Sequence, residues 1–465
     1  FEKLIRSIFP SAFTLAVVLT ILTFILALTA TDPVDIKYTA DPLYKALTTD
    51  PLVTSSNHFI QVLGFWYKGL WDTAMLAFAV QMMLILVLGY VLASTNAFRR
   101  IIDKALRFCT NTPRTAFIVT LLTLLVSFFN WGLGLIFGAL FARKAMEFGR
   151  SQNLSLNYPL IGAAGYSGLM VWHGGISGSA PLKVAEPGHF VTLIGQDLPA
   201  VDFSQTIFSE MNLATILVLL IVIPLAMFIL GKKHRNNTDS EMPEEIAKNQ
   251  PARPVLITGA EKVDHIKYAG ITLGLAFLAF SFLKGWMTGN MGVIDPNFLN
   301  FTLLGLGLVF SGTIANFLTS VKNAMVSASG ILIQFPLYFG IMGIMKYSGL
   351  VELFSSFLMD ISNETTFPIF TFFSAGLVNI FVPSGGGQWA VQGPIIVEAA
   401  QNLNIPVGKA VMALAYGDQI TNMLQPFWAI PLLGITGLKA REIIPFTLIL
   451  MIIGLIIFTT MLLIF

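Results

Sequence analysis

Charged side chains are scarce in this chain of 465 residues. Asp, Glu, Lys and Arg make up only 11% of it, whereas a typical soluble domain carries about 25%. A soluble fold of this length has too much surface to cover with so few charges, and 55% of the residues are hydrophobic, with a mean hydropathy of +0.76. The composition therefore excludes an ordinary soluble protein and predicts that lipid surrounds most of the chain.

Cysteine and clustered positive charge are nearly absent as well. The one cysteine, Cys109, excludes an internal disulfide and any metal or cluster site built from cysteines, so we expect a small buried apolar residue there. The net charge is +2, and no basic cluster favours a nucleic-acid partner. The expected partners are membrane lipid and a small substrate, and we expect no cofactor beyond a coupling ion.

Apolar segments recur along the whole chain, and several are near the 20 residues that cross a bilayer. We expect the first to be a membrane span, because it exceeds the apolar core of a signal peptide; the small residues at 27–30 keep a cleaved signal as the alternative. The segments lie at about 12–31, 72–94, 115–130, 131–148, 157–182, 208–230, 265–283, 298–318, 323–346, 366–383, 386–403, 406–436 and 443–465.

Two pairs of these segments are expected to form re-entrant hairpins. Segments 115–130 and 131–148 are separated only by residues 130–134, and segments 366–383 and 386–403 only by residues 383–387. Both joints are rich in glycine and carry no charge, which is typical of irregular backbone that lines a protein cavity at membrane depth. Two full crossings in each pair would leave the flanks on the same side, so the charges do not exclude that alternative.

The distribution of positive charge predicts the orientation in a bacterial inner membrane. With both hairpins entering and leaving on one side, the N-terminus is cytoplasmic and the C-terminus external. This arrangement places 20 of the 27 Lys and Arg residues in the cytoplasm. The seven on the outside are Lys37, Lys45, Lys68, Lys183, Lys284, Lys346 and Lys409.

Residues in the first half recur in the second at an offset of 249 to 253 positions, which indicates a repeat. The matched positions are Gln81, Asn130, Tyr166 and Pro181 with Gln334, Asn379, Tyr416 and Pro431. Five crossings separate the hairpins, so the second copy is expected to be inverted. The expected divisions are an N-terminal span and external loop at 1–56, a first repeat at 57–231, a cytoplasmic linker at 232–262 and a second repeat at 263–465. Segments 57–70 and 96–110 are expected to be interfacial helices.

Each hairpin is followed by a span that cannot be one regular helix. Segment 157–182 contains Gly-Gly and Ser-Gly-Ser, and segment 406–436 contains internal prolines, all of which disfavour helix. Unwound backbone offers free N–H and C=O groups, and the N-termini of half-helices attract anions. These segments predict an anion site beside carbonyl groups that could hold a cation; the alternative is that the small residues only pack helices closely.

Ionisable residues at membrane depth are few and therefore informative. Asp418 is expected to bind the coupling cation, either Na⁺ together with Thr421 and Asn422 or a proton; the alternative is a structural carboxylate that caps a half-helix. His173 is expected to donate to the substrate or relay a proton, or else to be a packing residue. The predicted substrate-binding residues are Asn130, Gly132, His173, Gly174, Gly175, Ser177, Ser179, Asn379, Ser384, Gly385, Gly386, Gly387, Asn422 and Gln425.

The central segments contain no Arg or Lys. Backbone N–H groups, hydroxyls and amides can hold one carboxylate, whereas two would usually need a guanidinium. A small monocarboxylate is therefore the favoured substrate. Tryptophans near the breaks, among them Trp131 and Trp428, would suit a short alkyl tail, although such aromatic residues mostly serve packing.

At these residues the chain resembles the bacterial short-chain fatty acid transporter family, within the ion-transporter superfamily. The motifs are VPSGGGQW at 382–389, VQGP at 391–394, AYGDQ at 415–419, QPFWA at 425–429, NWG at 130–132 and GGISGS at 174–179. His173 departs from the small or polar residue expected there. The resemblance implies a dimer with inverted repeats and an elevator-like movement of the hairpins, and it implies cation-driven uptake of butyrate or acetoacetate.

Together these features predict a secondary active transporter that takes up short-chain fatty acids by cation symport with alternating access. The main rival is the same architecture carrying a dicarboxylate, an amino acid or an aromatic acid. A channel would need a continuous polar path, which opposed hairpins do not favour. An intramembrane enzyme would need a nucleophile and base at depth, and one His and one Asp in different halves support that weakly, so we expect no enzyme and no catalytic residue.

Overall fold

The computed structural model describes residues 12–36, 47–93, 95, 104–234, 259–288, 296–360 and 362–465. Within these residues every regular element is a helix, which confirms the predicted all-α fold. Helices long and apolar enough to cross a membrane occur at His58–Leu92, Thr112–Phe129, Glu210–Lys233, Lys267–Thr288 and Ala440–Ile464. Shorter apolar helices occur at Ala16–Ala30, Asn297–Ser311, Phe367–Phe381 and Pro426–Thr436.

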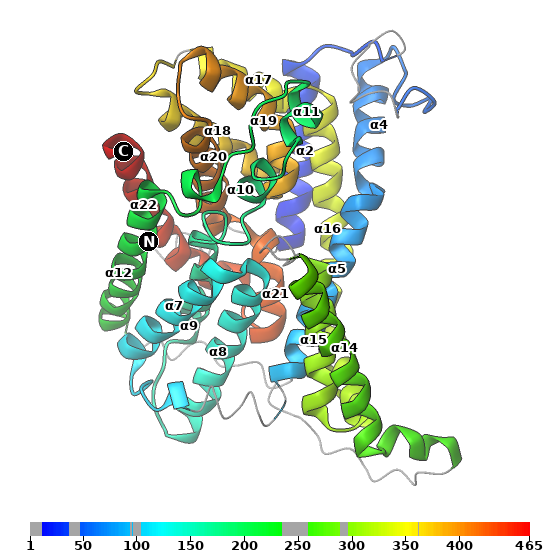
Figure 1. The fold of residues 1–465 in the computed structure, drawn as a ribbon, viewed down its shortest axis with the longest axis vertical. Helices are drawn as coiled ribbons and strands as arrows, with labels where there is room; N and C mark the ends of the chain where they lie inside the picture. The colour runs from blue at the N-terminus through cyan, green and yellow to red at the C-terminus, as the bar shows by residue number, and fades with distance from the viewer. Residues whose placement is uncertain are drawn as a thin grey trace.

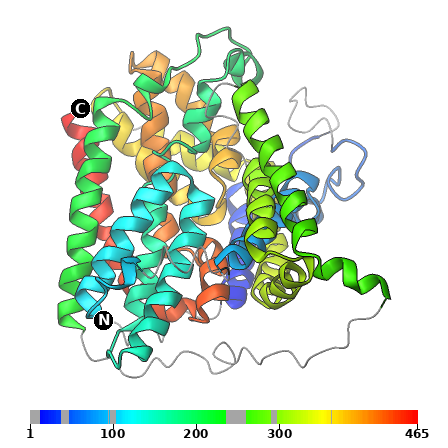
Figure 2. The same cartoon turned by 60° about the horizontal axis from the view of Figure 1, so that its bottom comes forward.

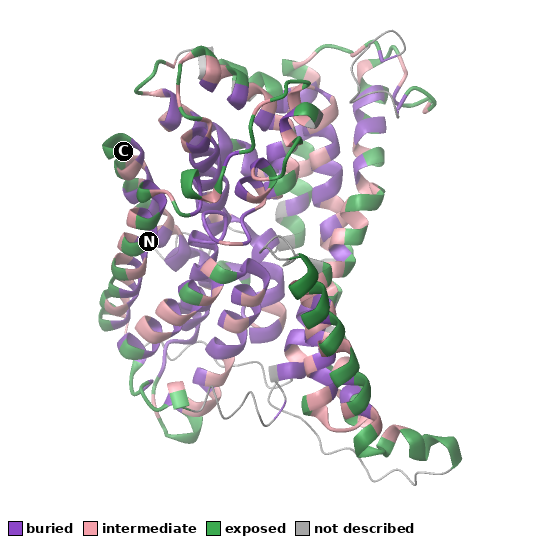
Figure 3. Ribbon diagram, viewed as in Figure 1, coloured by how far each residue is buried: buried purple, intermediate pink, exposed green. Residues whose placement is uncertain are grey.

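Two sets of helices face each other along the long axis of the molecule (Figure 1). The lower set consists of α7 (Thr112–Phe129), α8 (Trp131–Ser151) and α9 (Tyr158–Tyr166). The upper set consists of α18 (Phe367–Phe381), α19 (Gly385–Asn402) and α20 (Val407–Thr421). Buried backbone concentrates where the two sets meet (Figure 3).

The remaining long helices surround these sets. The helices α12 (Glu210–Lys233) and α22 (Ala440–Ile464) lie side by side along one edge (Figure 2). The other side is formed by α2 (Ala12–Ala30), α4 (His58–Leu70), α5 (Thr73–Ala93) and α16 (Ile314–Tyr347), with α14 (Lys267–Thr288) and α15 (Pro296–Ser311) leaning outward. The short helix α17 (Leu350–Asp360) packs against α18 and α19.

The boundary that the sequence placed between segments 298–318 and 323–346 is wrong. The break comes earlier, because Gly312 adopts a left-handed φ of 77° and the Thr313 hydroxyl accepts the N–H of Asn316 at 3.2 Å, which starts α16. As a result α16 runs unbroken for 34 residues. Lys322 therefore lies exposed on this helix instead of in a connection.

The predicted interfacial helix at 57–70 is also wrong in its packing. It is observed as α4, which packs lengthwise on α16 and leads directly into α5. A Cβ atom on Gly69 would lie only 2.8 Å from the Cα of Gly343 on α16, so the two backbones touch. The linker prediction at 232–262 and the second interfacial helix at 96–110 fall mostly outside the described residues.

The two predicted hairpins are present as packed helix pairs, but the glycines do not form their joints. The joint between α7 and α8 is the single extended residue Asn130. Gly134 lies inside α8, where a Cβ would be 1.9 Å from the Ser127 hydroxyl oxygen. In the second pair α18 ends at Phe381 and α19 begins at Gly385, so its glycines form the first helical turn.

The two broken spans are confirmed. In the first, α9 passes into the 3-10 turn η1 (Ser167–Met170), irregular backbone follows, and α10 (Ser179–Val184) resumes the helix. In the second, α20 passes into the 3-10 turn η5 (Asn422–Leu424), and α21 (Pro426–Thr436) follows. Glycine opens the first break, and the proline at the start of α21 ends the second.

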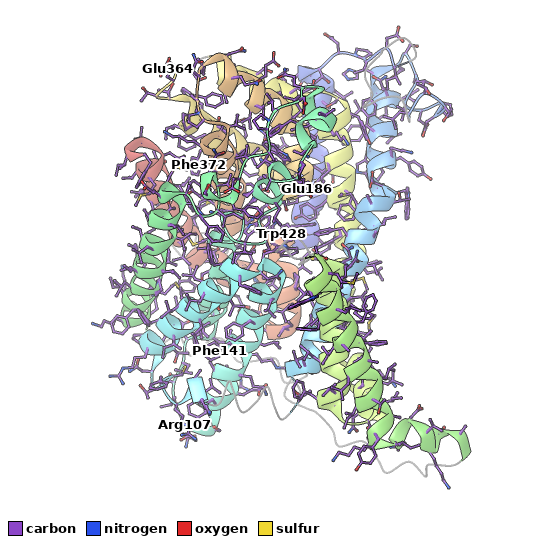
Figure 4. All side chains as sticks on the ribbon, viewed as in Figure 1. Arg107, Phe141, Glu186, Glu364, Phe372 and Trp428 are labelled. Carbon is purple, nitrogen blue, oxygen red and sulfur yellow. The ribbon has the colours of Figure 1, made fainter. Side chains whose placement is uncertain are left out.

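The predicted topology can be tested with single cysteines at the two ends of the molecule. Exposed Arg107 lies at the lower end and exposed Glu364 at the upper end (Figure 4). We expect Arg107→Cys to react with an impermeant maleimide only from the cytoplasm, and Glu364→Cys only from outside.

The background is suited to this experiment. Cys109 is fully buried, and burial raises the pKa of its thiol to about 11, so it should stay unreactive; Cys109→Ala is the control. Labelling of Arg107→Cys from outside would contradict the predicted orientation and the inverted arrangement of the hairpins.

Candidate functional site

The polar residues at the hairpin joints act as helix caps. The Asn130 side chain accepts the N–H of Leu133 at 2.9 Å, and the Ser177 hydroxyl accepts the N–H of Trp131 at 3.0 Å. At the second hairpin the Ser384 hydroxyl accepts the N–H of Gly387 at 3.2 Å. The counterpart of Asn130 is thus Ser384 and not Asn379, which lies inside α18. These caps hold both helix N-termini at the centre of the protein.

The first turn of α19 faces a large cavity. The first N–H groups of a helix have no acceptor within the helix, and Ser384 takes those of Gly387 and Gln388. The N–H groups of Gly385 and Gly386 are therefore the ones left for a ligand, and both glycines line the cavity. An anion at this position would also be favoured by the positive end of the helix dipole.

The cavity has a volume of ≈ 1410 Å³ and runs from exposed residues near Glu186 to buried residues near Trp428 (Figure 4). Aromatic rings form the buried end: the centroids of Trp131 and Trp428 lie 5.2 Å apart, and those of Trp131 and Trp172 lie 5.9 Å apart. The charged lining residues are Asp72, Lys183, Glu186, Asp202 and Lys346, while the buried end has no cationic side chain among the lining residues.

Behind this end of the cavity, His173 and Asp418 form a buried pair across 245 residues of sequence. The His173 Nδ1 lies 2.5 Å from the Asp418 Oδ2, and the two side chains are 0% and 1% exposed. The N–H of Ala180 donates to the His173 Nε2 at 3.1 Å. Because Nε2 must then keep its lone pair, the ring proton resides on Nδ1 and donates to the carboxylate. The imidazole is neutral, so an ionised Asp418 gives the pair one negative charge.

The first turn of α19 and this pair are direct neighbours. A Cβ on Gly385 would lie 2.8 Å from the His173 Cε1 and 2.7 Å from the Trp172 ring. The Trp172 and His173 rings are themselves stacked at 4.4 Å. Glycine is thus required at 385, because only a bare backbone lets the N-terminus of α19 reach the imidazole.

The predicted cation ligands Asp418, Thr421 and Asn422 do not face one another: the first contacts His173 and the other two contact Asn379. The Asp418 carboxylate turns to His173, whereas the Thr421 and Asn422 side-chain oxygens lie 2.9 and 2.8 Å from the Asn379 Nδ2. The Asp418 carbonyl is a third oxygen at 2.7 Å from that nitrogen. An amide carries two hydrogens for these three acceptors. Close by, the Asp418 Oδ1, the Asn379 Oδ1 and the Gln425 Oε1 are buried without a hydrogen-bond partner among the described residues.

Each half of the chain supports the break in the other half. The Tyr166 hydroxyl, from the first half, donates to the carbonyls of Asn422 and Gln425 at 2.8 and 3.1 Å. The Tyr416 hydroxyl, from the second half, donates to the Asn212 Oδ1 at 2.9 Å. Asn212 in turn donates its Nδ2 to the carbonyl of Gly174 at 2.8 Å. The Gln419 side chain adds a further link by accepting the N–H groups of residues 173 and 174.

The predicted site residues therefore fall into three places. Ser177, Ser179, Ser384, Gly385, Gly386 and Gly387 line the cavity. His173, Gly174, Asn379, Asp418, Thr421, Asn422 and Gln425 form the polar cluster behind it. Asn130, Gly132 and Gly175 lie at the first hairpin and its contacts, where a Cβ on Gly175 would be 2.4 Å from the carbonyl oxygen of Phe128.

Sequence reasoning missed Gln419, Asn212 and the bridging role of the two tyrosines. Gln419 follows Asp418 directly in a quoted motif, and the tyrosines were recognised only as repeat positions. Asn212 stands at the start of α12 in no motif, so no local signal marks it.

Comparison with known proteins gives consistent results. Residues 2–465 match the family described as short chain fatty acid transporter. A provisionally named short-chain fatty acid transporter of Escherichia coli (strain K12) is 36% identical over 386 residues, covering 83% of this chain and 85% of the relative. One of Haemophilus influenzae (strain ATCC 51907) is 35% identical over 397 residues, covering 83% and 86%. The solved structure of Neisseria gonorrhoeae MtrF, described with a class of antimetabolite efflux pumps, covers 100% of this chain and 97% of its own with a TM-score of 0.43 at 17% identity.

The bridging tyrosines lead to a stability prediction. Tyr166→Phe removes the one hydroxyl hydrogen that the buried carbonyls of Asn422 and Gln425 share, so we expect it to lower the free energy of unfolding in detergent by about 1–3 kcal/mol. Tyr338→Phe is the matched control, because the Tyr338 hydroxyl is equally buried but has no hydrogen-bond partner among the described residues. Equal unfolding midpoints for both variants would mean that the Tyr166 contact contributes nothing.

Proposed function

The chain belongs to the short-chain fatty acid transporter family, and from this premise we propose that it takes up small monocarboxylates such as butyrate or acetoacetate by cation symport. Membership agrees with the resemblance seen in the motifs: the chain is a multi-pass membrane transporter and not an enzyme. The observation that carries the substrate proposal is the buried end of the cavity, where two free amide groups meet tryptophan rings.

The substrate carboxylate is proposed to bind the N–H groups of Gly385 and Gly386, with the hydroxyls of Ser179 and Ser384 beside them. The alkyl tail would then lie on the rings of Trp131, Trp172 and Trp428. A dicarboxylate would leave its second charge among these rings, where no guanidinium or ammonium is present to pair with it.

Cation coupling is proposed to follow from the charge of the His173–Asp418 pair. An ionised Asp418 lies behind Gly385, so a bound carboxylate would place a second negative charge beside it in a low-dielectric site. A cation that neutralises Asp418 would remove this repulsion, and each ligand would then favour the other. Sodium is the first candidate, because side-chain oxygens of Asp418, Asn379 and Gln425 are buried without a hydrogen-bond partner among the described residues, and a hard cation takes oxygen ligands. A proton on the Asp418 Oδ1 is the second, because the bond of Oδ2 to His173 leaves that oxygen free.

Alternating access is proposed to use two inverted repeats, residues 57–231 and 263–465, that carry the hairpins toward opposite sides. The facing positions of α7–α8 and α18–α19 support this proposal (Figure 1). We further propose an elevator-like movement, a homodimer, a bacterial inner-membrane location and a cytoplasmic N-terminus. Labelled butyrate or acetoacetate should accumulate in proteoliposomes under a Na⁺ or pH gradient, whereas preferred accumulation of succinate, an amino acid or benzoate would favour the rival substrates.

The carboxylate site can be tested at Gly386. A Cβ there would meet nothing closer than the Ser179 Cβ at 3.8 Å, so the helix tolerates a side chain that points into the cavity. We expect Gly386→Leu to raise the KM for butyrate at least about tenfold, because the side chain would block the approach of the carboxylate to the N–H of residue 386. Losing one charge-assisted hydrogen bond costs about 1.5–3 kcal/mol. The unfolding midpoint should stay unchanged.

Gly285→Leu is the matched control, because a side chain on this α14 residue meets no atom within 4 Å. It should transport butyrate like the wild type. Ser384→Ala should also reduce uptake, but it removes the α19 cap as well and therefore tests the site less cleanly. A wild-type KM in Gly386→Leu would exclude the α19 N-terminus as the carboxylate site.

The variant Asp418→Asn can distinguish sodium coupling from proton coupling. Under sodium coupling, Asp418→Asn should bind substrate without dependence on Na⁺, because the neutral amide no longer repels the carboxylate. Under proton coupling, the variant should lose accumulation driven by a pH gradient but keep substrate exchange. The exposed acid Glu398 gives the control Glu398→Gln, which should behave like the wild type. Unchanged gradient-driven accumulation in Asp418→Asn would return Asp418 to a structural role.

A further inference from the structure

A segment that starts with the last part of the first broken span and ends before α12 covers the second hairpin. It contains α10 and α11 (His189–Ile194) and lies beside α19 (Figure 1). The buried side chains of Val184 and Phe190 share an apolar core with Trp389 and Ile396 of α19. This covering segment begins at Ala180, whose N–H holds His173, so it connects the buried pair with the hairpin.

One polar contact fastens the covering segment to α19. The indole N–H of Trp389 donates to the Nε2 of His189 at 2.9 Å, and the two rings are stacked at 6.3 Å with 26° between their planes. Trp389 is 1% exposed, whereas His189 is partly exposed and lines the cavity. Trp389 lies one helical turn beyond Gly385 and Gly386. The hydrogen bond from its ring to His189 therefore also positions the amide groups proposed to bind the carboxylate.

This contact requires a neutral histidine. Nε2 accepts a hydrogen bond only while it carries no proton; in the protonated ring it would become a donor facing another donor. The charged groups around His189 are the Lys183–Glu186 ion pair at 3.0 Å on its own segment and Asp202 on the same cavity. From α19, residues 385–397 present no charged side chain.

The direction of the pH effect follows from these surroundings. Partial burial lowers the pKa of His189, the Glu186 carboxylate opposes this shift, and Lys183 adds to it. A lowered pKa means that the neutral, bonded form is favoured at neutral pH and above. The contact is lost as the pH falls through that pKa.

We propose that His189 is a positioning residue for transport: by holding Trp389 it fixes the first turn of α19. Its protonation breaks this contact and makes the start of α19 more mobile, a change termed release of the hairpin. The effect on carboxylate binding rests on the proposed function. The release of the hairpin does not rest on the proposed function, because it follows from the hydrogen bond between His189 and Trp389.

Release of the hairpin can be measured without any substrate. A nitroxide attached to Val391→Cys in a Cys109→Ala background reports the mobility of α19 next to the cavity, and its line shape is recorded after labelling from about pH 8 to about pH 5. We expect a mobile component to grow as the pH falls. His189→Gln keeps a neutral acceptor and should stay immobile throughout, whereas His189→Phe should be mobile at every pH.

Transport kinetics give the second measurement. The KM for butyrate of the wild type, divided by that of His189→Gln at the same pH, should rise by roughly 2- to 10-fold on acidification, the range for losing one neutral hydrogen bond. The ratio removes any pH effect of the coupling ion, which both proteins share. The control His265→Gln changes an exposed histidine far from the cavity lining and should follow the wild type.

The outcomes separate the two proposals. A line shape that does not change with pH in the wild type, or that changes equally in His189→Gln, would overturn the role of His189. A chain that transports no butyrate but shows the expected line shapes would refute the proposed substrate while supporting the release of the hairpin. A constant KM ratio with the expected line shapes would contradict the link to the carboxylate site.

Discussion

The structure depends on satisfying unwound backbone where water cannot reach it. Both broken helices leave carbonyl and amide groups at the centre of the protein, and an unpaired group there costs as much as a lost hydrogen bond or more. The solution is reciprocal, because Tyr166 serves the second break while Tyr416, through Asn212, serves the first. The crossing of the two breaks is therefore a single unit to which both halves contribute.

The polar residues of this unit have two different roles. Side chains that accept backbone N–H groups, such as Gln419 and the capping residues, keep the breaks open in a defined shape. The Asp418 carboxylate, whose Oδ1 has no hydrogen-bond partner among the described residues, and the first turn of α19 both contact His173. The protein thus presents an anion-attracting helix end beside a buried acid, and close packing of glycine backbone makes this proximity possible.

Local rules were enough to predict the breaks, because glycine pairs and internal prolines disfavour helix wherever they occur. They also located the hairpins, since two short apolar runs with an uncharged joint are unusual. The same rules misplace the joints: they predict a turn at the glycines after Asn130, but Asn130 caps α8 and makes the turn alone. The start of α16 was missed because Gly312 and Thr313 stand in an apolar stretch that masks them. The His173–Asp418 contact joins positions 245 residues apart, and no local pattern could reveal it. The sequence marks each of them only as an isolated ionisable residue at membrane depth.

Because the ribosome makes the first half of the chain before the second, the contacts between the two breaks form late in synthesis. The first half is inserted in the membrane long before residues 416–425 exist, yet the N–H groups of His173 and Gly174 and the His173 ring have their partners, Gln419 and Asp418, in that late stretch. Until then the first break must be held by water, lipid headgroups or an insertion factor. The polar contacts of the first break are therefore completed only when the C-terminal region has been made. A chain truncated before residue 416 would expose unpaired backbone groups of the first break to membrane quality control.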